Sequence, residues 1–358
     1  MIVTKTPFRL SFFGGGTDYP EYFESHGGSV LTASLDHWAF VSISRFYSKL
    51  FDYNLRVGYR QLECVKSVEE IQHGGFRECL RRYGVTKDAE INYTAHLPAF
   101  TGVGSSSSFL VGLLNALHAY RGRTVPALDL AYEAIEMERH VLNENVGCQD
   151  QAQAAVGGFN VLEFRSETDI RVHPVGLSPE RLAAFENHLL MFFTGIRRRA
   201  SDLAGRQIDR IPLNLATLRR MREMVDEAHS SLLGGGSFAR FGELLHESWR
   251  LKQTLDSRVS NPMIGDLYET GLRAGALGGK LLGAGGGGFL VFFVPPERHA
   301  ALRQSLSRIE EVPVRLGVPG SHRLTGADSE LPHAGSPSES VSNLRTIAAA
   351  SSSPFAVK

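Results

Sequence analysis

The chain has 358 residues, of which 42% are hydrophobic and 21% are charged, and its 38 basic residues balance its 38 acidic ones. This neutral balance argues against a nucleic acid or a membrane surface as a partner, since both usually require a basic excess. The cysteines Cys64, Cys79 and Cys148 are scattered without a CxxC pair, which argues against a disulfide framework and a zinc site. With no signal-peptide layout and no apolar run of roughly 18 residues, we expect a cytoplasmic protein.

The first half of the chain is predicted to alternate strands and helices. Residues 2–13 read as a strand that runs directly into three glycines, and one or two strands are expected over 30–46. Another strand is expected over 89–98. Apolar residues at helical spacing follow it, and a second helix is expected over about 127–142. A short strand at GFNVLEF closes this half.

The second half is predicted to be mostly helical, with helices over 179–185, 214–232 and 238–255. It ends in GGKLLGAGGGGFLVFFVPPERHAALRQSL, which reads as a glycine loop, a strand and a helix. After about Gly317 the composition shifts to Ser, Pro, Ala and Gly, so a disordered tail is expected over 321–358.

The stretch TGVGSSSS, residues 101–108, stands between a predicted strand and a predicted helix. Gly102 and Gly104 allow the backbone to turn its amides inward, and a helix start supplies unpaired N–H groups and the positive end of the helix dipole. The serine hydroxyls add donors or a ligand for Mg²⁺. Because strand, loop and helix follow one another directly, the pattern favours a phosphate site over a flexible loop with an ordinary cap.

Other phosphate and nucleophile motifs do not fit the sequence. A Walker A loop requires Gly-Lys-Ser/Thr, whereas Gly279-Lys280 is followed by Leu281. No serine lies in a G-x-S-x-G elbow, which leaves a hydrolase triad without its nucleophile. The glycines of GAGGGG match G-x-G-x-x-G, but a strand follows them rather than a helix, the wrong order for a dinucleotide site.

Glu138 lies where a carboxylate is not expected. The helix over 127–142 has an apolar stripe, into which Glu138 falls, while its other charged residues lie toward the solvated side. The stripe consists of Leu130, Ala131, Ala134, Ile135, Val141 and Leu142. Because a buried carboxylate is costly unless it is paired or binds a metal, both a structural salt bridge and a metal site remain open.

Asp150 opens the next helical segment. Gly147 is expected to end the preceding helix, and by itself Asp150 would most often be an N-cap. Together with a serine suited to Mg²⁺ and a buried glutamate, it suggests phosphoryl transfer. That chemistry needs a phosphate cradle, a divalent ion and a residue that orients or deprotonates the nucleophile.

Three stretches in chain order, TPFRLSFFGGGTDY, LPAFTGVGSSSS and KLLGAGGGGF, resemble the three motifs of the GHMP small-molecule kinases. This family includes galactokinase and the homoserine, mevalonate and phosphomevalonate kinases. The resemblance implies an α+β, two-domain fold with the active site in the cleft between the domains. The N-terminal domain (1–175) would be ribosomal-protein-S5-domain-2-like and the C-terminal domain (176–320) ferredoxin-like. ATP and Mg²⁺ are the implied cofactors.

The resemblance also assigns roles to residues at matching positions. Ser106 and Glu138 would hold Mg²⁺, and Asp150, twelve residues after Glu138, would be the catalytic carboxylate. Arg9 matches the basic residue that ends the first motif and lies beside that carboxylate. The loop around the ATP phosphates would consist of Gly102, Val103, Gly104, Ser105, Ser106 and Ser107.

Within the family, FFGGGTDYPEY and GCQDQAQAAVGGF most resemble the D-glycero-D-manno-heptose 7-phosphate kinases. Those enzymes phosphorylate the anomeric hydroxyl and give the 1,7-bisphosphate for activated-heptose synthesis. The resemblance implies that the GGGTD turn binds sugar hydroxyls, and that the protein is a monomer or a homodimer. The candidate substrate contacts are Gly15, Gly16, Thr17, Asp18, Arg198 and Gly286.

A sugar phosphate needs cations, and FFTGIRRRASDL offers Arg197, Arg198 and Arg199. Arg198 occupies the basic position of a TGxxRxA pattern that resembles this branch, and guanidinium groups pair with phosphate in a bidentate manner. The alternative is a solvated basic helix start, because three adjacent arginines cannot all face one ligand. Lys280 is expected at the surface beside the last glycine loop.

Two other functions remain open. A 1-kinase for an unphosphorylated sugar such as L-fucose is one, although the arginine cluster argues against it. A non-catalytic, galactokinase-like sugar and ATP sensor is the other, although it would not need Arg9, Ser106, Glu138 and Asp150 together. A decarboxylase of the same superfamily is less favoured, because nothing in the sequence prefers a mevalonate-type substrate to a sugar.

Overall fold

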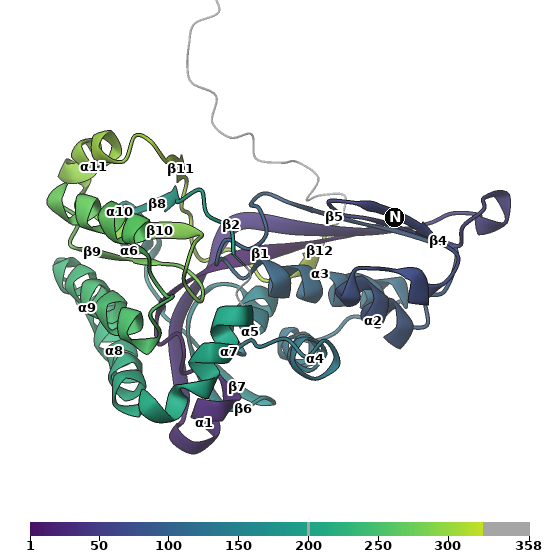
Figure 1. Cartoon of the computed structure of the whole chain (residues 1–358), viewed down its shortest axis with the longest axis horizontal. Helices are drawn as coiled ribbons and strands as arrows, with labels where there is room; N and C mark the ends of the chain where they lie inside the picture. The colour runs from purple at the N-terminus through teal and green to yellow at the C-terminus, as the bar shows by residue number, and fades with distance from the viewer. Residues whose placement is uncertain (199–200, 325–358) are drawn as a thin grey trace, which may run out of the picture. The chain divides into compact units, whose positions relative to one another are not determined.

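The computed structural model describes residues 1–198 and 201–324, and residues 1–323 form one compact unit (Figure 1). The expected tail beyond Leu324 and the predicted cation Arg199 lie outside the described residues. No helix in the described part of the chain is long and apolar enough to cross a membrane.

The described strands form two sheets. The first has the order β12-β1-β2-β5-β3-β4, and β2 also pairs with β6, which pairs with β7. Its strands are β1 (Ile2–Phe13), β2 (Gly28–Arg45), β3 (Leu55–Gly58), β4 (Leu62–Val65), β5 (Ala89–Ala95), β6 (Phe159–Ser166), β7 (Asp169–Pro174) and β12 (His322–Arg323). The second sheet is antiparallel, in the order β11-β8-β10-β9. It contains β8 (Leu189–Phe193), β9 (Gly278–Leu281), β10 (Phe289–Phe293) and β11 (Glu310–Val312).

Helices pack against both sheets. In the first half they are α1 (Pro20–His26), α2 (Gly74–Arg82), α3 (Ser105–Tyr120), α4 (Ala127–Glu136), a π-helical continuation (Met137–Val141) and α5 (Gln149–Val156). In the second half they are α6 (Pro179–Glu186), α7 (Ser201–Asp209), α8 (Leu215–Leu233), α9 (Ala239–Leu255), α10 (Pro262–Arg273) and α11 (His299–Ser305). Short 3₁₀ turns cover Ser48–Leu50, Val68–Glu70, Ile211–Leu213 and Pro296–Arg298.

A cluster of buried aromatic side chains joins the two sheets. The ring centroid of Phe12 on β1 lies 5.5–5.6 Å from those of Phe159, Phe185 and Phe241. Phe241, on α9, lies 5.2 Å from Phe293 on β10. The contacts of Phe12 with Phe185 and Phe241 are edge-to-face, a geometry that adds stability to that of the apolar area the rings bury. The cluster therefore fixes the end of β1, and the loop after it, relative to the second sheet.

Most predicted elements are confirmed. Residues 2–13 form one strand, the predicted strands over 30–46 form the single long β2, and a strand follows the GAGGGG loop. The prediction for Gly147 is wrong, because the helix ends at Val141, several residues earlier. Asn143 has a left-handed backbone (φ 53°), a conformation that ends helices. Val141 is 38% exposed and does not belong to the apolar stripe.

The C-terminal segment of the described chain returns to the first sheet. β12 pairs with β1, and the amide of Ser321 donates to the carbonyl of Ala154. The predicted domain ranges, 1–175 and 176–320, remain predictions, and β12 lies just beyond the second of them. Gly157 makes the closest contact here, since a Cβ on it would lie 2.0 Å from the amide nitrogen of Gly320.

We expect Gly157→Ala to destabilise the protein far more than Gly122→Ala, as measured by urea unfolding. The two glycines have nearly the same φ, 70° and 71°, but a Cβ on Gly122 would meet no atom within 4 Å. Alanine at 122 should therefore cost about 1–2 kcal/mol for its backbone conformation alone. At 157 the Gly320 backbone must also shift, which should add roughly 2 kcal/mol or more. Equal losses in the two variants would contradict the close packing of this segment.

Candidate active site

The phosphate-loop candidate lies between β5 and α3. Gly104 stands at the N-cap with a left-handed backbone (φ 74°), and α3 begins at Ser105. Among the described residues no side chain caps this end, so the first amides of the helix keep their capacity to bind an anion. The loop also contacts the second sheet, because the Phe289 amide donates to the Thr101 carbonyl at 3.3 Å.

Glu138 is held by three donors from two helices. The hydroxyl of Ser106 donates to Oε1 at 3.0 Å, the hydroxyl of Ser107 donates to Oε2 at 2.6 Å, and Gln151 Nε2 also donates to Oε2. Glu138 is 1% exposed, whereas Ser106 is exposed. No cation in the described part of the chain pairs with this carboxylate, so the salt-bridge alternative is wrong. The Ser106 hydroxyl and the Glu138 carboxylate instead place two oxygens 3.0 Å apart, and Ser106 is the exposed member of the pair.

Burial raises the pKa of Glu138 to about 7, and the nearby negative charge of Asp150 adds to that effect. The hydrogen bonds from Ser107, Ser106 and Gln151 act in the opposite direction, because they stabilise the ionised carboxylate. Burial outweighs them. The uncompensated negative charge suits a divalent cation, and hard oxygen donors are the ligands that Mg²⁺ prefers. Mg²⁺ usually takes one or two carboxylates together with substrate phosphates, which fits one carboxylate and one hydroxyl here.

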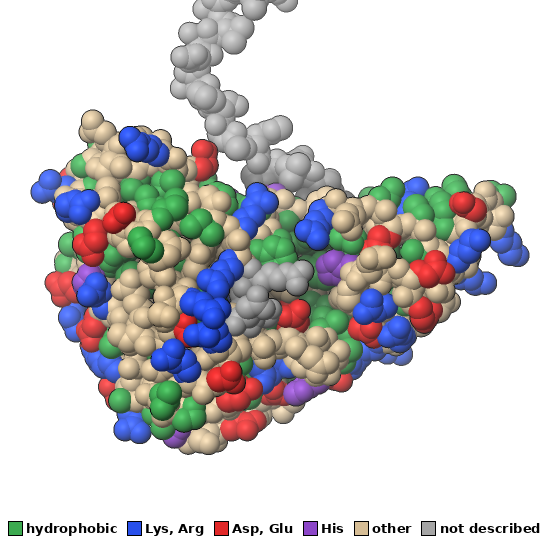
Figure 2. Space-filling model, in the orientation of Figure 1, with side chains coloured by type: hydrophobic (Ala, Val, Ile, Leu, Met, Phe, Trp, Pro, Cys, Tyr) green, Lys and Arg blue, Asp and Glu red, His purple; other side chains and the backbone are tan. Residues whose placement is uncertain are grey.

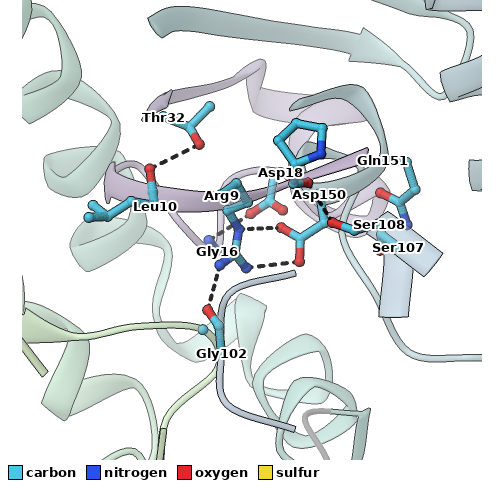
Figure 3. A network of polar contacts seen from close by, with 12 residues as sticks. Arg9, Leu10, Gly16, Asp18, Thr32, Gly102, Ser107, Ser108, Asp150 and Gln151 are labelled. Atoms are coloured by element: carbon cyan, nitrogen blue, oxygen red, sulfur yellow. Dashed lines mark hydrogen bonds and ion pairs between the residues drawn. The ribbon is translucent and has the colours of Figure 1, made fainter. Parts of the chain in front are cut away.

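Arg9 and Asp150 form a bidentate ion pair (Figure 3). Arg9 Nε and Nη2 each donate to one carboxylate oxygen at 2.8 Å, and Nη1 donates to the Gly102 carbonyl of the loop. Arg9 is 4% exposed. Asp150 lies in the first turn of α5, whose N-cap is Cys148, so its side chain is turned toward Arg9 rather than used as a cap. One guanidinium therefore fixes both the carboxylate and the loop.

Asp18 lies beside this pair and is 3% exposed. Its Oδ1 accepts the Gly16 amide at 2.9 Å. Burial raises the pKa of Asp18, and the charge of Asp150 contributes. A Cβ on Gly147 would lie 2.0 Å from Oδ2, so only glycine fits at 147 when the carboxylate takes this position. Gly147 thus makes room for Asp18.

The GGGTD turn is held together by Thr17. Its hydroxyl donates toward the carbonyls of Gly14 and Ser29 at 2.9 Å and accepts the Ser29 amide at 3.1 Å. Thr17 is fully buried. Since these contacts occupy its hydroxyl, Thr17 shapes the turn rather than facing a ligand. Gly15 lies close to α5, where a Cβ on it would be 3.8 Å from Gln149 Nε2.

Two lysines that were not predicted as site residues are buried near the site. Lys252, on α9, is 6% exposed and its Nζ donates to the Gly283 carbonyl. The prediction that Lys280 is a surface residue is wrong, because it is 3% exposed and donates to the Phe12 carbonyl at 2.8 Å. Burial lowers the pKa of Lys252 to about 8 and that of Lys280 well below its ordinary value.

Of the predicted arginines, Arg198 lies against the last glycine loop. It is half-buried, and a Cβ on Gly286 would lie 2.7 Å from its Nη1, whereas Arg197 is exposed. Lys and Arg side chains gather near the middle of the face in Figure 2, in the region where Figure 1 places α7. Arg206 on α7 and Arg210 just after it both donate to Asp256 Oδ2.

A groove of about 620 Å³ lies elsewhere, among the helices that cover the first sheet. Its lining includes Tyr83, His118 and Glu133, which bond to one another at 2.6–2.8 Å. It contains none of the predicted site residues. Chemically, the residues around Arg9 are the better match to a reaction, since they combine a loop that leads into an uncapped helix start, an oriented carboxylate and a candidate metal site.

Two family models match the chain. The model described as GHMP kinases N terminal domain matches residues 69–158, and that described as GHMP kinases C terminal matches residues 219–308. A D-glycero-alpha-D-manno-heptose 7-phosphate kinase of Campylobacter jejuni is 30% identical over 86% of this chain and 93% of its own length. An L-fucokinase/L-fucose-1-P guanylyltransferase of Bacteroides fragilis is 24% identical over 84% of this chain, which spans 35% of that longer protein.

Solved structures share the fold. A D-glycero-D-manno-heptose 1-phosphate kinase from Bacteroides thetaiotaomicron superposes with a TM-score of 0.74 at 22% identity, over 91% of this chain and 99% of that one. Galactokinase of Lactococcus lactis, in complex with galactose, gives 0.70 at 18% identity over 90% and 95%. The predicted two-domain α+β fold is thereby confirmed.

We expect Glu138→Gln to raise the melting temperature of the metal-free protein above pH 7. In the unfolded chain a glutamate titrates near 4.5, and Glu138 in the folded protein titrates at about 7. Between pH 4.5 and about 7 the folded state therefore binds more protons than the unfolded state. The free energy of unfolding falls as pH rises through this range, by up to about 3 kcal/mol. The advantage of the variant should be small at pH 5 and largest at pH 8, as read by thermal unfolding in a chelator.

Glu136→Gln is the matched control, because Arg82 lowers the pKa of Glu136 instead of raising it. That variant should gain no stability between pH 5 and 8. A Glu138→Gln protein whose melting temperature tracks that of the parent at every pH would contradict the buried, costly carboxylate.

Proposed function

The chain belongs to the GHMP kinase family, and from this membership we propose that it phosphorylates the anomeric C1 hydroxyl of D-glycero-D-manno-heptose 7-phosphate with ATP. The family makes it a phosphotransferase with an alcohol acceptor. The heptose is supported by the Campylobacter jejuni relative, whose printed name is that activity. The observation that carries the proposal is the bidentate Arg9–Asp150 pair beside the phosphate loop.

Asp150 is the proposed base or orienting group for the acceptor. Its carboxylate is fixed by Arg9, and the C1 hydroxyl would donate a hydrogen bond to it. The hydroxyl oxygen forms a bond to the γ-phosphorus, the bond from that phosphorus to the β,γ-bridging oxygen breaks, and ADP leaves. The hydroxyl proton passes to Asp150 and then to solvent. In a loose transition state the positioning of the hydroxyl matters more than its early deprotonation.

The loop from Gly102 to Ser107 is the proposed cradle for the ATP phosphates. The uncapped amides of α3 and the positive end of its dipole face the anion. Ser106 and Glu138 would hold Mg²⁺, which would neutralise phosphate charge when it is bound. Arg9 would stabilise the charge on the γ-phosphoryl group during transfer, since it lies against the loop.

The sugar is proposed to bind between the GGGTD turn and the last glycine loop. Gly15, Gly16 and Asp18 would contact its hydroxyls, and Thr17 keeps the turn in shape through its three hydrogen bonds. Arg198, beside Gly286, would bind the 7-phosphate. A half-buried guanidinium with donors in a fixed plane suits a phosphate better than a flexible surface lysine would.

A 1-kinase for free L-fucose is the second candidate, favoured by the Bacteroides fragilis relative. The two candidates are separated by turnover of ATP with Mg²⁺ and a panel of heptose 7-phosphate, mannose 6-phosphate, mannose and L-fucose. The position of the new phosphate would be read by ³¹P NMR. Formation of a 1,7-bisphosphate supports the proposal, turnover of free sugars alone contradicts it, and ATP binding without turnover points to a sensor.

We expect Asp150→Asn to lower kcat by at least about 100-fold, because it removes an interaction used mainly in the transition state. The affinity for ATP, measured by calorimetry, should change less than about threefold. Asp129→Asn is the control, since Asp129 also lies in the first turn of its helix but is exposed. If Asp150→Asn turned over at the parental rate, Asp150 would have no part in the reaction.

We expect Arg198→Ala to raise KM for the sugar phosphate by at least about tenfold and to change KM for an unphosphorylated sugar much less. The loss of a charge-assisted contact to phosphate accounts for the difference. Arg197→Ala, at the exposed neighbouring position, should leave both values within twofold. Equal losses on both sugars, or an equal effect of Arg197→Ala, would contradict a phosphate contact at Arg198.

A further inference from the structure

Lys252 lies at the junction of the two glycine-containing loops. Its Nζ donates to the carbonyl of Gly283, the first residue of the last glycine loop. A Cβ on Gly283 would lie 2.5 Å from the Cα of Gly102, and a Cβ on Gly102 would lie 2.3 Å from the Leu282 carbonyl oxygen. The two loops thus touch backbone to backbone, and only glycine permits this approach.

A cation holds each side of this contact. Arg9 donates to the Gly102 carbonyl on the phosphate-loop side, and Lys252 donates to the Gly283 carbonyl on the other. Both side chains are buried, at 4% and 6% exposed. Charge-assisted hydrogen bonds are about twice as strong as neutral ones, so the two donors fix the carbonyls firmly.

The charge of Lys252 offsets the carboxylates around it. The groups that face it are Arg9 on β1, Asp18 in the turn, Asp150 on α5 and Lys280 on β9. Burial lowers the pKa of Lys280 well below its ordinary value and so favours its neutral form, which leaves Arg9 and Lys252 as the two cations that face the two carboxylates. Without the ammonium of Lys252, two carboxylates would face one guanidinium and would repel a negatively charged phosphoryl group nearby.

We propose that Lys252 is a positioning residue for phosphoryl transfer, which holds the last glycine loop against the phosphate loop and adds positive charge next to the Arg9–Asp150 pair. This inference rests on the proposed kinase function. Lys252 acts through the Gly283 carbonyl and through its charge, and the contacts with substrate belong to the residues of the two loops.

Lys280 supplies the matched comparison. It is as buried as Lys252 and also donates to a single carbonyl, but that carbonyl belongs to Phe12 inside β1, within the joined sheets. Its contact stabilises the packing of the sheets, whereas the Lys252 contact fixes a loop of the site. Removal of either ammonium therefore costs one buried hydrogen bond to a carbonyl. In Lys252 the lost bond lies at a loop of the site, whereas in Lys280 it lies within the packed sheets.

The test compares Lys252→Met with Lys280→Met in the full-length protein. Lys252→Met should lower kcat by about 30-fold or more at a temperature where it is fully folded, with the Kd for ATP within about threefold by calorimetry. Lys280→Met should lower the melting temperature and keep kcat within about threefold. Lys252→Arg, which keeps the charge, should regain part of the lost kcat.

The pH dependence of kcat separates this role from a purely structural one, because a purely structural lysine would not change that dependence. The pKa of Lys252, lowered to about 8, predicts that kcat of the parent falls as pH rises through 8, because the ammonium loses its charge. In Lys252→Arg this alkaline fall should disappear, since a guanidinium stays protonated.

The inference is overturned if Lys252→Met loses no more kcat than Lys280→Met, or if Lys252→Arg retains the parental alkaline fall. All rates are measured with the best acceptor of the sugar panel and expressed relative to the parent. Failure of the parent to turn over any sugar overturns the proposed function instead, so the two failures are distinguishable.

Discussion

The bidentate pair of Arg9 and Asp150 is the interaction on which the site depends. It joins β1, α5 and the phosphate loop, because the same guanidinium also donates to Gly102. A buried ion pair stabilises a protein only when its remaining donors are satisfied, and here three nitrogens of Arg9 donate to three oxygens. The pair therefore sets the geometry of the site: without Asp150 the guanidinium would lack its main acceptor, and only its contact with the Gly102 carbonyl would remain.

Around this pair the protein holds several ionisable groups whose charged forms are disfavoured by burial. Burial disfavours the charged forms of Glu138, Asp18, Lys252 and Lys280, and the fold holds all four within or beside the same set of loops. The aromatic cluster around Phe12 supplies compensating stability nearby. Charged groups fixed in this way are favourable only when the substrate, the metal and the transferring phosphoryl group bring the opposite charges.

The sequence marked two of the candidate groups locally, the loop over 102–107 by glycines next to a helix start and Glu138 by its place within an apolar stripe. Asp150 by itself looked like an N-cap, and its proposed role came from the family resemblance. The burial of Lys252 and Lys280 was not predicted, because a lysine in a helix or strand looks like a solvated residue until the packing of the two sheets is known. Gly147 was misread for the same reason: its partner, the carboxylate of Asp18, lies more than a hundred residues away in the chain. Local pattern identifies the groups that carry chemistry, while long-range contacts decide which others surround them.

The pairing of β12 with β1 has a consequence for folding kinetics. Thr4 and Lys5 pair with Arg323 and His322, so this contact closes a loop of more than three hundred residues. A contact of such sequence separation is expected to form late, because the chain entropy lost in closing the loop is recovered only when the pairing is complete. Substitutions that weaken β12 should therefore speed unfolding more than they slow folding.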